Sequence, residues 1–71
     1  MSQLTPLEAL QATVRLAGGV RAVAQDLSIS RVAVHKWFRT GRAPAHRVEA
    51  LHRLGRGLVP REALRPDLPW E

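Results

Sequence analysis

The sequence predicts an all-α fold, a small bundle of four to five helices that forms a single domain over residues 1–71. Apolar residues recur at spacings of three and four, and glycine and proline divide the chain into segments of helical length. No segment alternates apolar and polar residues as a strand does. At 71 residues, folding buries only about 60% of the surface that the unfolded chain exposes. The core is therefore expected to be small and closely packed.

The first helix is predicted over residues 6–16, because capping signals mark its start. Thr5 is the N-cap, Pro6 takes the first helical position, and Glu8 follows three residues after the cap, as in a capping box. Gly18 is expected to stop the helix. The residues expected to be buried on it are Leu7, Leu10 and Val14.

Two further short helices, over about residues 19–27 and 30–40, are spaced as a helix-turn-helix. Ala24 is the small residue where the two helices of such a motif pack closest, and Ser30 is expected to cap the second helix. Ser28 stands in the turn, where such motifs usually place glycine. A left-handed backbone costs a serine about 1 kcal/mol, so the turn is expected to be slightly strained or to adopt another conformation. The apolar residues expected to face the core are Val23, Leu27, Ile29, Val34 and Trp37.

The helix over residues 30–40 has two chemically different faces. At about 100° per residue, Val34, Trp37 and Phe38 fall in one arc, which is expected to be buried. We interpret both aromatic residues as part of the core and not as platforms for single-stranded bases. The opposite arc, which is expected to face outward, contains Arg31, Val32, His35, Lys36 and Arg39.

A fourth helix is predicted from Pro44 to a stop at Gly55. Its inner face is expected to consist of Val48, Leu51 and Leu54. Beyond it, residues 57–71 can form at most one helical turn, near residues 60–64, because two later prolines block extension.

The positive charge of the chain is concentrated in its middle. The formal net charge is +5, from eleven Lys and Arg residues and six Asp and Glu residues. Residues 1–30 and 57–71 are each near neutral, whereas residues 31–56 contain a single acid, Glu49. A localised cationic patch attracts polyanions, so nucleic acid is the leading partner, ahead of an anionic membrane or an acidic protein. The cations of this segment are Arg31, Lys36, Arg39, Arg42, Arg47, Arg53 and Arg56.

Several other classes of protein are disfavoured by what the sequence lacks. Without cysteine there is no disulfide, no cysteine-based zinc site and no thiol nucleophile. No pattern of metal ligands and no pair of nucleophile and base is recognisable, so we expect no metal, no cofactor and no enzymatic activity. No apolar run approaches the roughly 18 residues that span a bilayer, and the N-terminus lacks the pattern of a signal peptide. A cytoplasmic location without membrane association is expected.

Four short motifs occur in the order typical of one family of DNA-binding proteins. They are Gly18-Gly19 before the second helix, Val34 to Trp37 in the third, Gly41 to Pro44 before the fourth, and Leu64 to Asp67 in the tail. With these motifs, residues 18–70 resemble the YdaS-like branch of the Cro and CI phage-repressor family. The resemblance implies a lambda-repressor-like helix-turn-helix domain that binds DNA. It does not imply one biological role, because the family includes Cro-type repressors, plasmid and prophage regulators, and proteins labelled antitoxins.

The resemblance also implies that four outward residues of the third helix enter the major groove, namely Arg31, Val32, His35 and Lys36. Their chemistry fits this role. Arg31 and Lys36 can donate to guanine, and His35 can bond a base edge or a phosphate. Val32 either meets a thymine methyl group or is a tolerated exposed apolar residue. A cationic helix face can be no more than a solvated surface, but the complete helix-turn-helix spacing favours base reading.

A second set of residues is expected to contact the DNA backbone. Some begin the second and third helices, and helix N-termini favour phosphate groups. The others follow the third helix and are expected to fix the register of the protein on DNA without reading bases. The set comprises Gly19, Val20, Arg21, Ser30, Arg39, Arg42 and His46.

The sequence therefore predicts a sequence-specific regulator of transcription that binds double-stranded DNA, and we interpret it as a Cro-like repressor. One recognition helix covers few base pairs, so a homodimer on two half-sites about one helical turn apart is expected. Leu68 and Trp70 are the apolar residues least needed by a four-helix core. The alternative is an antitoxin-type module whose tail, residues 58–71, holds a protein partner. A tail packed on the core through Leu58, Leu64 and Leu68 would favour the repressor.

Overall fold

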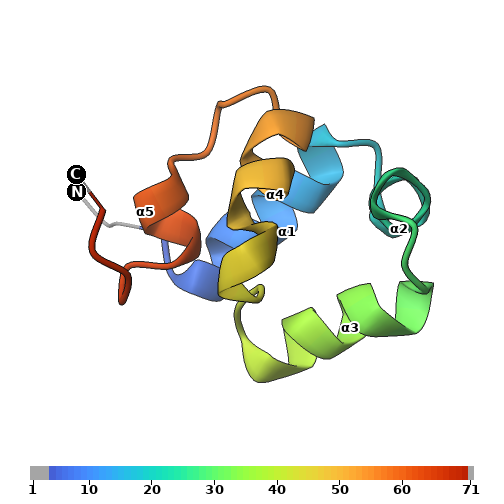
Figure 1. Ribbon diagram of the computed structural model, residues 1–71, viewed down its shortest axis with the longest axis horizontal. Coiled ribbons are helices and arrows are strands. Elements are labelled where there is room, and N and C mark those ends of the chain that lie inside the picture. The colour runs from blue at the N-terminus through green and yellow to red at the C-terminus, as the bar shows by residue number, and fades with distance from the viewer. Residues whose placement is uncertain (1–3, 71) are drawn as a thin grey trace.

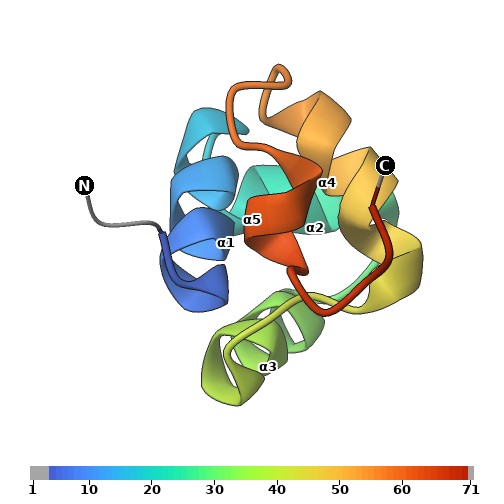
Figure 2. The same ribbon diagram turned by 90° about the vertical axis from the view of Figure 1, so that its left-hand side faces the viewer.

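A computed structural model describes residues 4–70 of the protein, and this part of the chain is entirely helical (Figure 1). Helices α1 and α4 lie at the centre, and α5 and α2 flank them on opposite sides. In both Figure 1 and Figure 2, α3 lies below this group, so that one long side of α3 faces away from the rest of the molecule. The predicted all-α bundle with a helix-turn-helix is confirmed. The elements are α1 (Pro6–Leu16), α2 (Val20–Leu27), α3 (Arg31–Thr40), the 3₁₀ turn η1 (Ala45–Arg47), α4 (Val48–Leu54) and α5 (Arg61–Leu64).

Local capping explains where α1 begins. The Thr5 hydroxyl accepts a hydrogen bond from the Glu8 amide at 3.1 Å, and the Glu8 carboxylate accepts one from the Thr5 amide at 2.9 Å. This is the reciprocal capping box that the sequence predicts. The bond from the Thr5 amide lowers the pKa of Glu8 below its ordinary value. The predicted bounds of this helix, residues 6–16, are confirmed.

The turn of the helix-turn-helix is left-handed at Ser28, which is one of the two conformations that the sequence left open. Ser28 has φ 56° and ψ 43°. Its amide donates to the Gln25 carbonyl at 3.2 Å, and the Ile29 amide donates to the Ala24 carbonyl at 2.9 Å. These two bonds form a Schellman motif, which satisfies carbonyl groups at the end of α2. The turn therefore has the usual geometry of a glycine C-cap, built here on a serine.

The start of α4 differs from the prediction, whereas its end at Gly55 is as predicted. Pro44 is followed by η1, and regular α-helix begins only at Val48. Gly55 ends the helix, but with φ −84° it needs no left-handed backbone. It is buried against α1, where an added Cβ atom would lie 3.0 Å from the Thr13 methyl group. Glycine fits there because the two helices approach closely and a larger residue would crowd the Thr13 side chain.

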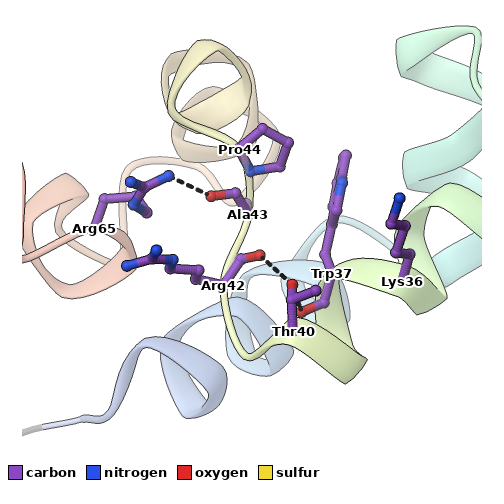
Figure 3. Close-up of a pocket in the computed structure, with 7 residues that line it drawn as sticks. All are labelled: Lys36, Trp37, Thr40, Arg42, Ala43, Pro44 and Arg65. Carbon is purple, nitrogen blue, oxygen red and sulfur yellow. Dashed lines mark hydrogen bonds between the residues drawn. The ribbon is translucent and has the colours of Figure 1, made fainter.

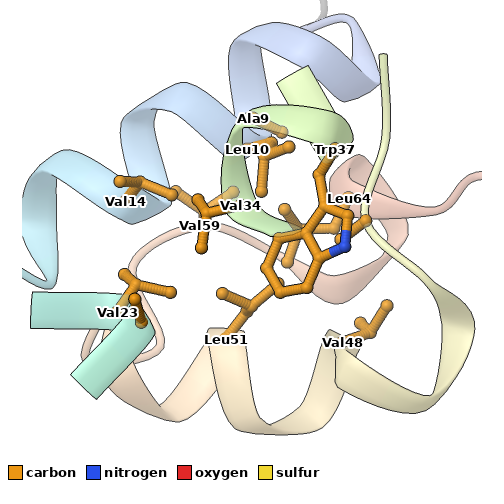
Figure 4. Packing of buried hydrophobic residues seen from close by; sticks show 12 residues of the cluster. Ala9, Leu10, Val14, Val23, Val34, Trp37, Val48, Leu51, Val59 and Leu64 are labelled. Atoms are coloured by element: carbon orange, nitrogen blue, oxygen red, sulfur yellow. The ribbon is translucent and has the colours of Figure 1, made fainter. Parts of the chain in front are cut away.

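One core joins α1, α2, α3, α4 and the segment after α4 (Figure 4). Val34 is fully buried and Trp37 is 8% exposed, as predicted for the inner arc of α3, whereas Phe38 of the same arc is half-buried and packs against the core. Three leucines expected inside, namely Leu7, Leu27 and Leu54, are only half-buried. Those leucines lie near the ends of their helices, where fewer neighbours cover them. The core comprises Ala9, Leu10, Val14, Val23, Ala24, Val34, Trp37, Ala43, Val48, Leu51, Val59 and Leu64.

The C-terminal tail is packed on this core, although not through all the predicted residues. It forms the single expected turn, α5, and Leu64 is fully buried. Of the two other leucines whose packing would favour the repressor, Leu58 is 66% exposed, and Leu68 is half-buried but is not part of the core cluster. The neighbouring Val59 is buried. The Val59 carbonyl lies 2.9 Å from Nδ1 of His52, which ties this loop to α4. Trp70, one of the apolar residues that the sequence marked as least needed by a four-helix core, is half-buried and packs against the core.

Replacing Trp37 with alanine should lower the free energy of unfolding by about 3 to 5 kcal/mol, because it removes a large buried side chain from a small core. Chemical denaturation monitored by circular dichroism measures this change. Leu58→Ala is the control, since the side chain is 66% exposed and its loss should change stability by less than about 0.5 kcal/mol. Equal, small effects of the two substitutions would contradict the position assigned to Trp37.

Replacing Ser28 with glycine should raise the free energy of unfolding by up to about 1 kcal/mol. The native backbone at this residue is left-handed, and glycine adopts that conformation without the steric cost that a side chain carries. Arg21→Gly, at an exposed position inside α2, should instead lower stability by about 0.5 to 1 kcal/mol. Thermal unfolding of the two variants shows whether each change in stability is positive or negative. Destabilisation by Ser28→Gly would contradict this prediction.

Candidate nucleic-acid interface

The outward face of α3 is a continuous exposed surface of cationic and polar side chains. Every residue of the predicted outer arc is exposed, and Val32 is the most exposed large apolar residue of the described chain at 74%. The His35 ring meets the edge of Phe38, with ring centroids 6.1 Å apart, so His35 is partly oriented by a residue that packs on the core. The exposed face comprises Arg31, Val32, His35, Lys36 and Arg39.

The N-cap of α3 uses the predicted serine. The Ser30 hydroxyl oxygen accepts from the Ala33 amide at 3.1 Å, and Ser30 itself is exposed. Its hydroxyl hydrogen is not used in this bond and points to no described protein acceptor. Ser30 can therefore cap the helix and still donate to an anion at the start of α3.

On one flank of α3, the start of α2 borders a hollow of about 390 Å³. Gly19, the N-cap of α2, has φ 104° and lines this hollow with Val20 and Phe38. Arg21 is exposed next to them. Gln11 and Arg15 of α1 also line the hollow and were not predicted as site residues. Their spacing of four on a helix was the only signal in the sequence that could have paired them.

On the other flank, the end of α3 borders a second hollow of about 300 Å³, which we call the Arg42 hollow (Figure 3). The Thr40 hydroxyl bonds the carbonyl groups of Trp37 and Arg42, at 3.1 Å and 3.2 Å, and so fixes the chain as it leaves α3. His46 follows in η1 and is exposed. The Arg42 hollow is lined by Lys36, Trp37, Thr40, Arg42, Ala43, Pro44 and Arg65.

The C-terminal tail contributes an ion cluster to this hollow that the sequence did not reveal. Arg65 donates to both carboxylate oxygens of Asp67, at 2.8 Å and 2.7 Å, and to the Ala43 carbonyl at 3.0 Å. The hydrogen bonds from Arg65 lower the pKa of Asp67 from its ordinary value of 3.8 to about 2. Arg42 lies 3.7 Å from the same carboxylate. The motif from Leu64 to Asp67 carries part of the family resemblance, but no local pattern in the sequence links it to residues 42 and 43.

The fold divides the cationic segment that the sequence presents as one patch. Arg31, Lys36 and Arg39 lie on α3, but α4 runs away from α3, so that its end at Leu54 lies at the opposite side of the molecule (Figures 1 and 2). Arg53 and Arg56 are carried by that far end. The prediction of a single patch over residues 31–56 is wrong in this respect. These residues are close in sequence, but the direction of α4 separates them in space.

Comparison with protein families matches residues 10–71 to the family described as "Bacterial toxin YdaS". The chain belongs to this family. A protein of Escherichia coli (strain K12), named "Putative transcriptional regulator YdaS", is 43% identical to it over 54 residues, which is 75% of this chain. The chain spans about half the length of that relative, since the match covers 55% of it.

A solved structure supports the assignment to a Cro-type fold. The structure of "the Cro protein from putative prophage element Xfaso 1 in Xylella fastidiosa strain Ann-1" superposes with a TM-score of 0.81 and 32% sequence identity. The match covers 89% of this chain and 97% of that protein. The predicted resemblance to YdaS-like and Cro-type helix-turn-helix proteins is confirmed.

Two further properties of this YdaS family member concern residues 4–70. None of their helices combines the length and the apolar character needed to cross a membrane. The same residues contain no group of three or more His, Cys, Asp or Glu side chains placed to hold a metal ion.

Asp67 should make folding stability depend on pH between about 4 and 2. Its pKa is about 2 in the folded protein, against an ordinary value of 3.8, so its contribution is present above pH 4 and is lost as the pH falls through 2. The difference in free energy of unfolding between the wild type and Asp67→Asn should therefore shrink over this range. Glu62→Gln, which removes an exposed carboxylate outside the cluster, is the matched control. A difference that stays constant from pH 5 to 2 would contradict the pairing with Arg65.

Proposed function

We propose that this protein is a sequence-specific, double-stranded DNA-binding regulator of transcription that acts as a Cro-like repressor in the cytoplasm. The observation that carries the proposal is the outward face of α3, where cationic and polar side chains are all exposed on a helix whose other face is buried. In a helix-turn-helix, this is the face that lies in the major groove. Its chemistry is that of base recognition.

Four residues of α3 are proposed to read base edges. Arg31 can present its guanidinium fork to O6 and N7 of guanine, and Lys36 can donate to the same base type. His35 can bond a base edge or a phosphate. The high exposure of Val32 places a branched apolar side chain among these polar groups, which supports contact with a thymine methyl group.

The flanks of α3 are proposed to hold the DNA backbone. On one flank are Gly19, Val20 and Arg21 at the start of α2, together with Ser30. On the other are Arg39 and Arg42 at the end of α3 and His46 in η1. The two hollows border the same helix from two sides, as contacts to the two walls of a groove require. Such contacts supply affinity that is independent of sequence.

A homodimer on DNA is proposed to complete the site. Helix α3 has 10 residues, which corresponds to about 15 Å and can reach only a few base pairs. The domain measures 32 × 23 × 22 Å. Two copies therefore fit side by side on half-sites separated by about 34 Å, one turn of DNA.

The packed tail favours this regulator over a module that holds a protein partner through the tail. Leu64 and Val59 are buried in the core, and Trp70 packs against it. An antitoxin-type tail would keep such apolar residues available for its partner. The family description contains the word "toxin", but it specifies no chemical activity that could be matched to the described residues.

Arg31→Ala and Arg42→Ala should weaken DNA binding in different ways. A base contact is worth about 1 to 3 kcal/mol of discrimination, so loss of Arg31 should flatten the preference at one position in each half-site. Loss of Arg42 should weaken all sequences alike and reduce the slope of log affinity against log salt by about 0.9. Both side chains are exposed, so both variants should remain folded.

The measurement begins with selection of bound duplexes from random DNA, followed by titration of each variant against the best site and its single-base variants. Arg53→Ala is the charge-matched control, because this exposed arginine lies at the far end of α4. It should change affinity less than either test variant. If Arg31→Ala and Arg42→Ala lower every affinity by one common factor, base reading by α3 is refuted.

A further inference from the structure

The Arg42 hollow combines a surface proposed to face DNA with an acid from the C-terminal tail. Asp67 is the only carboxylate in this cluster of described residues, and it lies 3.7 Å from Arg42. Figure 3 shows the Arg42 side chain directed toward Arg65 and away from Lys36, which lies on the other side of Trp37. Arg42 thus turns from the recognition helix toward the tail. Asp67 is therefore an acid that lies among cations at the edge of this surface.

Asp67 is held in place by side chains of the C-terminal tail. Arg65, whose side chain is 13% exposed, grips the carboxylate with two hydrogen bonds and anchors itself on the Ala43 carbonyl. The following residues are pinned as well. The Trp70 indole donates to the Arg65 carbonyl, and the Arg61 guanidinium lies 5.8 Å from the centre of the Trp70 ring. The carboxylate therefore has a fixed place beside Arg42.

We infer that Asp67 competes with the DNA backbone for Arg42 and so limits the affinity of the domain for DNA of any sequence. The inference rests on the proposed function. The Arg42 side chain is 55% exposed and can turn to a phosphate. When it does so, it loses its attraction to Asp67. Arg65 stays with Asp67 in either case, because its two short bonds and its burial hold it.

The expected size of the effect follows from the exposure of the pair. Exposed ion pairs contribute up to about 1 kcal/mol, which corresponds to about fivefold in a binding constant. Asp67→Asn should therefore tighten binding by about 2- to 5-fold. The factor should be the same on operator and on mixed-sequence DNA, because the competition concerns a phosphate and not a base.

The test is a double-mutant cycle of Asp67→Asn and Arg42→Ala, with a mixed-sequence duplex as the probe and one fixed salt concentration. Asp67→Asn should tighten binding when Arg42 is present. In the Arg42→Ala background, the fold-change in affinity caused by Asp67→Asn should be less than half as large. Glu62→Gln is the control for net charge, since this exposed acid lies on α5 outside the cluster. It should change affinity by the same small factor in both backgrounds.

Folding is checked by circular dichroism for each variant, and Asp67→Ser replaces Asp67→Asn if the asparagine variant is unfolded. The inference is overturned if the aspartate substitution changes affinity equally with and without Arg42, or weakens binding while the fold is intact. In those cases the wild type still binds DNA and the proposed function stands. If no variant and no wild type binds any duplex at low salt, the proposed function and this inference fail together.

Discussion

Burial of one side of α3 by Val34 and Trp37 is the constraint on which the rest of the structure depends. These two side chains join α3 to the core that α1 and α4 form. Because a helix turns through about 100° per residue, fixing this side determines which residues face outward. Arg31, Lys36 and their neighbours are therefore displayed by packing that involves none of their own charges. A small domain has a free energy of unfolding of only a few kcal/mol, so loss of this packing would remove the binding surface together with the fold.

The helices could be predicted from the sequence because the signals that define them are local. The capping box at Thr5 spans three residues, and the two arcs of α3 follow from spacing alone. At Ser28 the motif indicated a turn but left two backbone conformations open, and the structure has the left-handed one. Degree of burial was predicted less well, as the half-buried Leu7 and Leu54 show. Periodicity identifies the inner face of a helix, but not how far its ends extend beyond their neighbours.

What could not be predicted depends on contacts between distant parts of the chain. Arg65 reaches the Ala43 carbonyl across 22 positions of sequence, and no spacing rule connects the two. The far position of Arg53 and Arg56 is a similar case, because it follows from the direction in which α4 leaves η1. A count of charges along the chain treats these arginines as equivalent to those on α3. The tail motif was recognised from the resemblance to a known family, but only the structure shows which residues this motif contacts.

The inferred competition between Asp67 and the DNA backbone for Arg42 would adjust affinity without involving the residues proposed to read bases. Each cation that meets the backbone adds affinity for every sequence, whereas a base contact adds affinity for one. A genome offers a large excess of non-specific sites, so backbone attraction and base discrimination are separate requirements. Val34 and Trp37 fix the face of α3 that bears the side chains proposed to read bases, and Arg65 holds Asp67 beside Arg42. Substitutions in the tail would thus alter attraction to the DNA backbone, whereas base discrimination would still depend on α3.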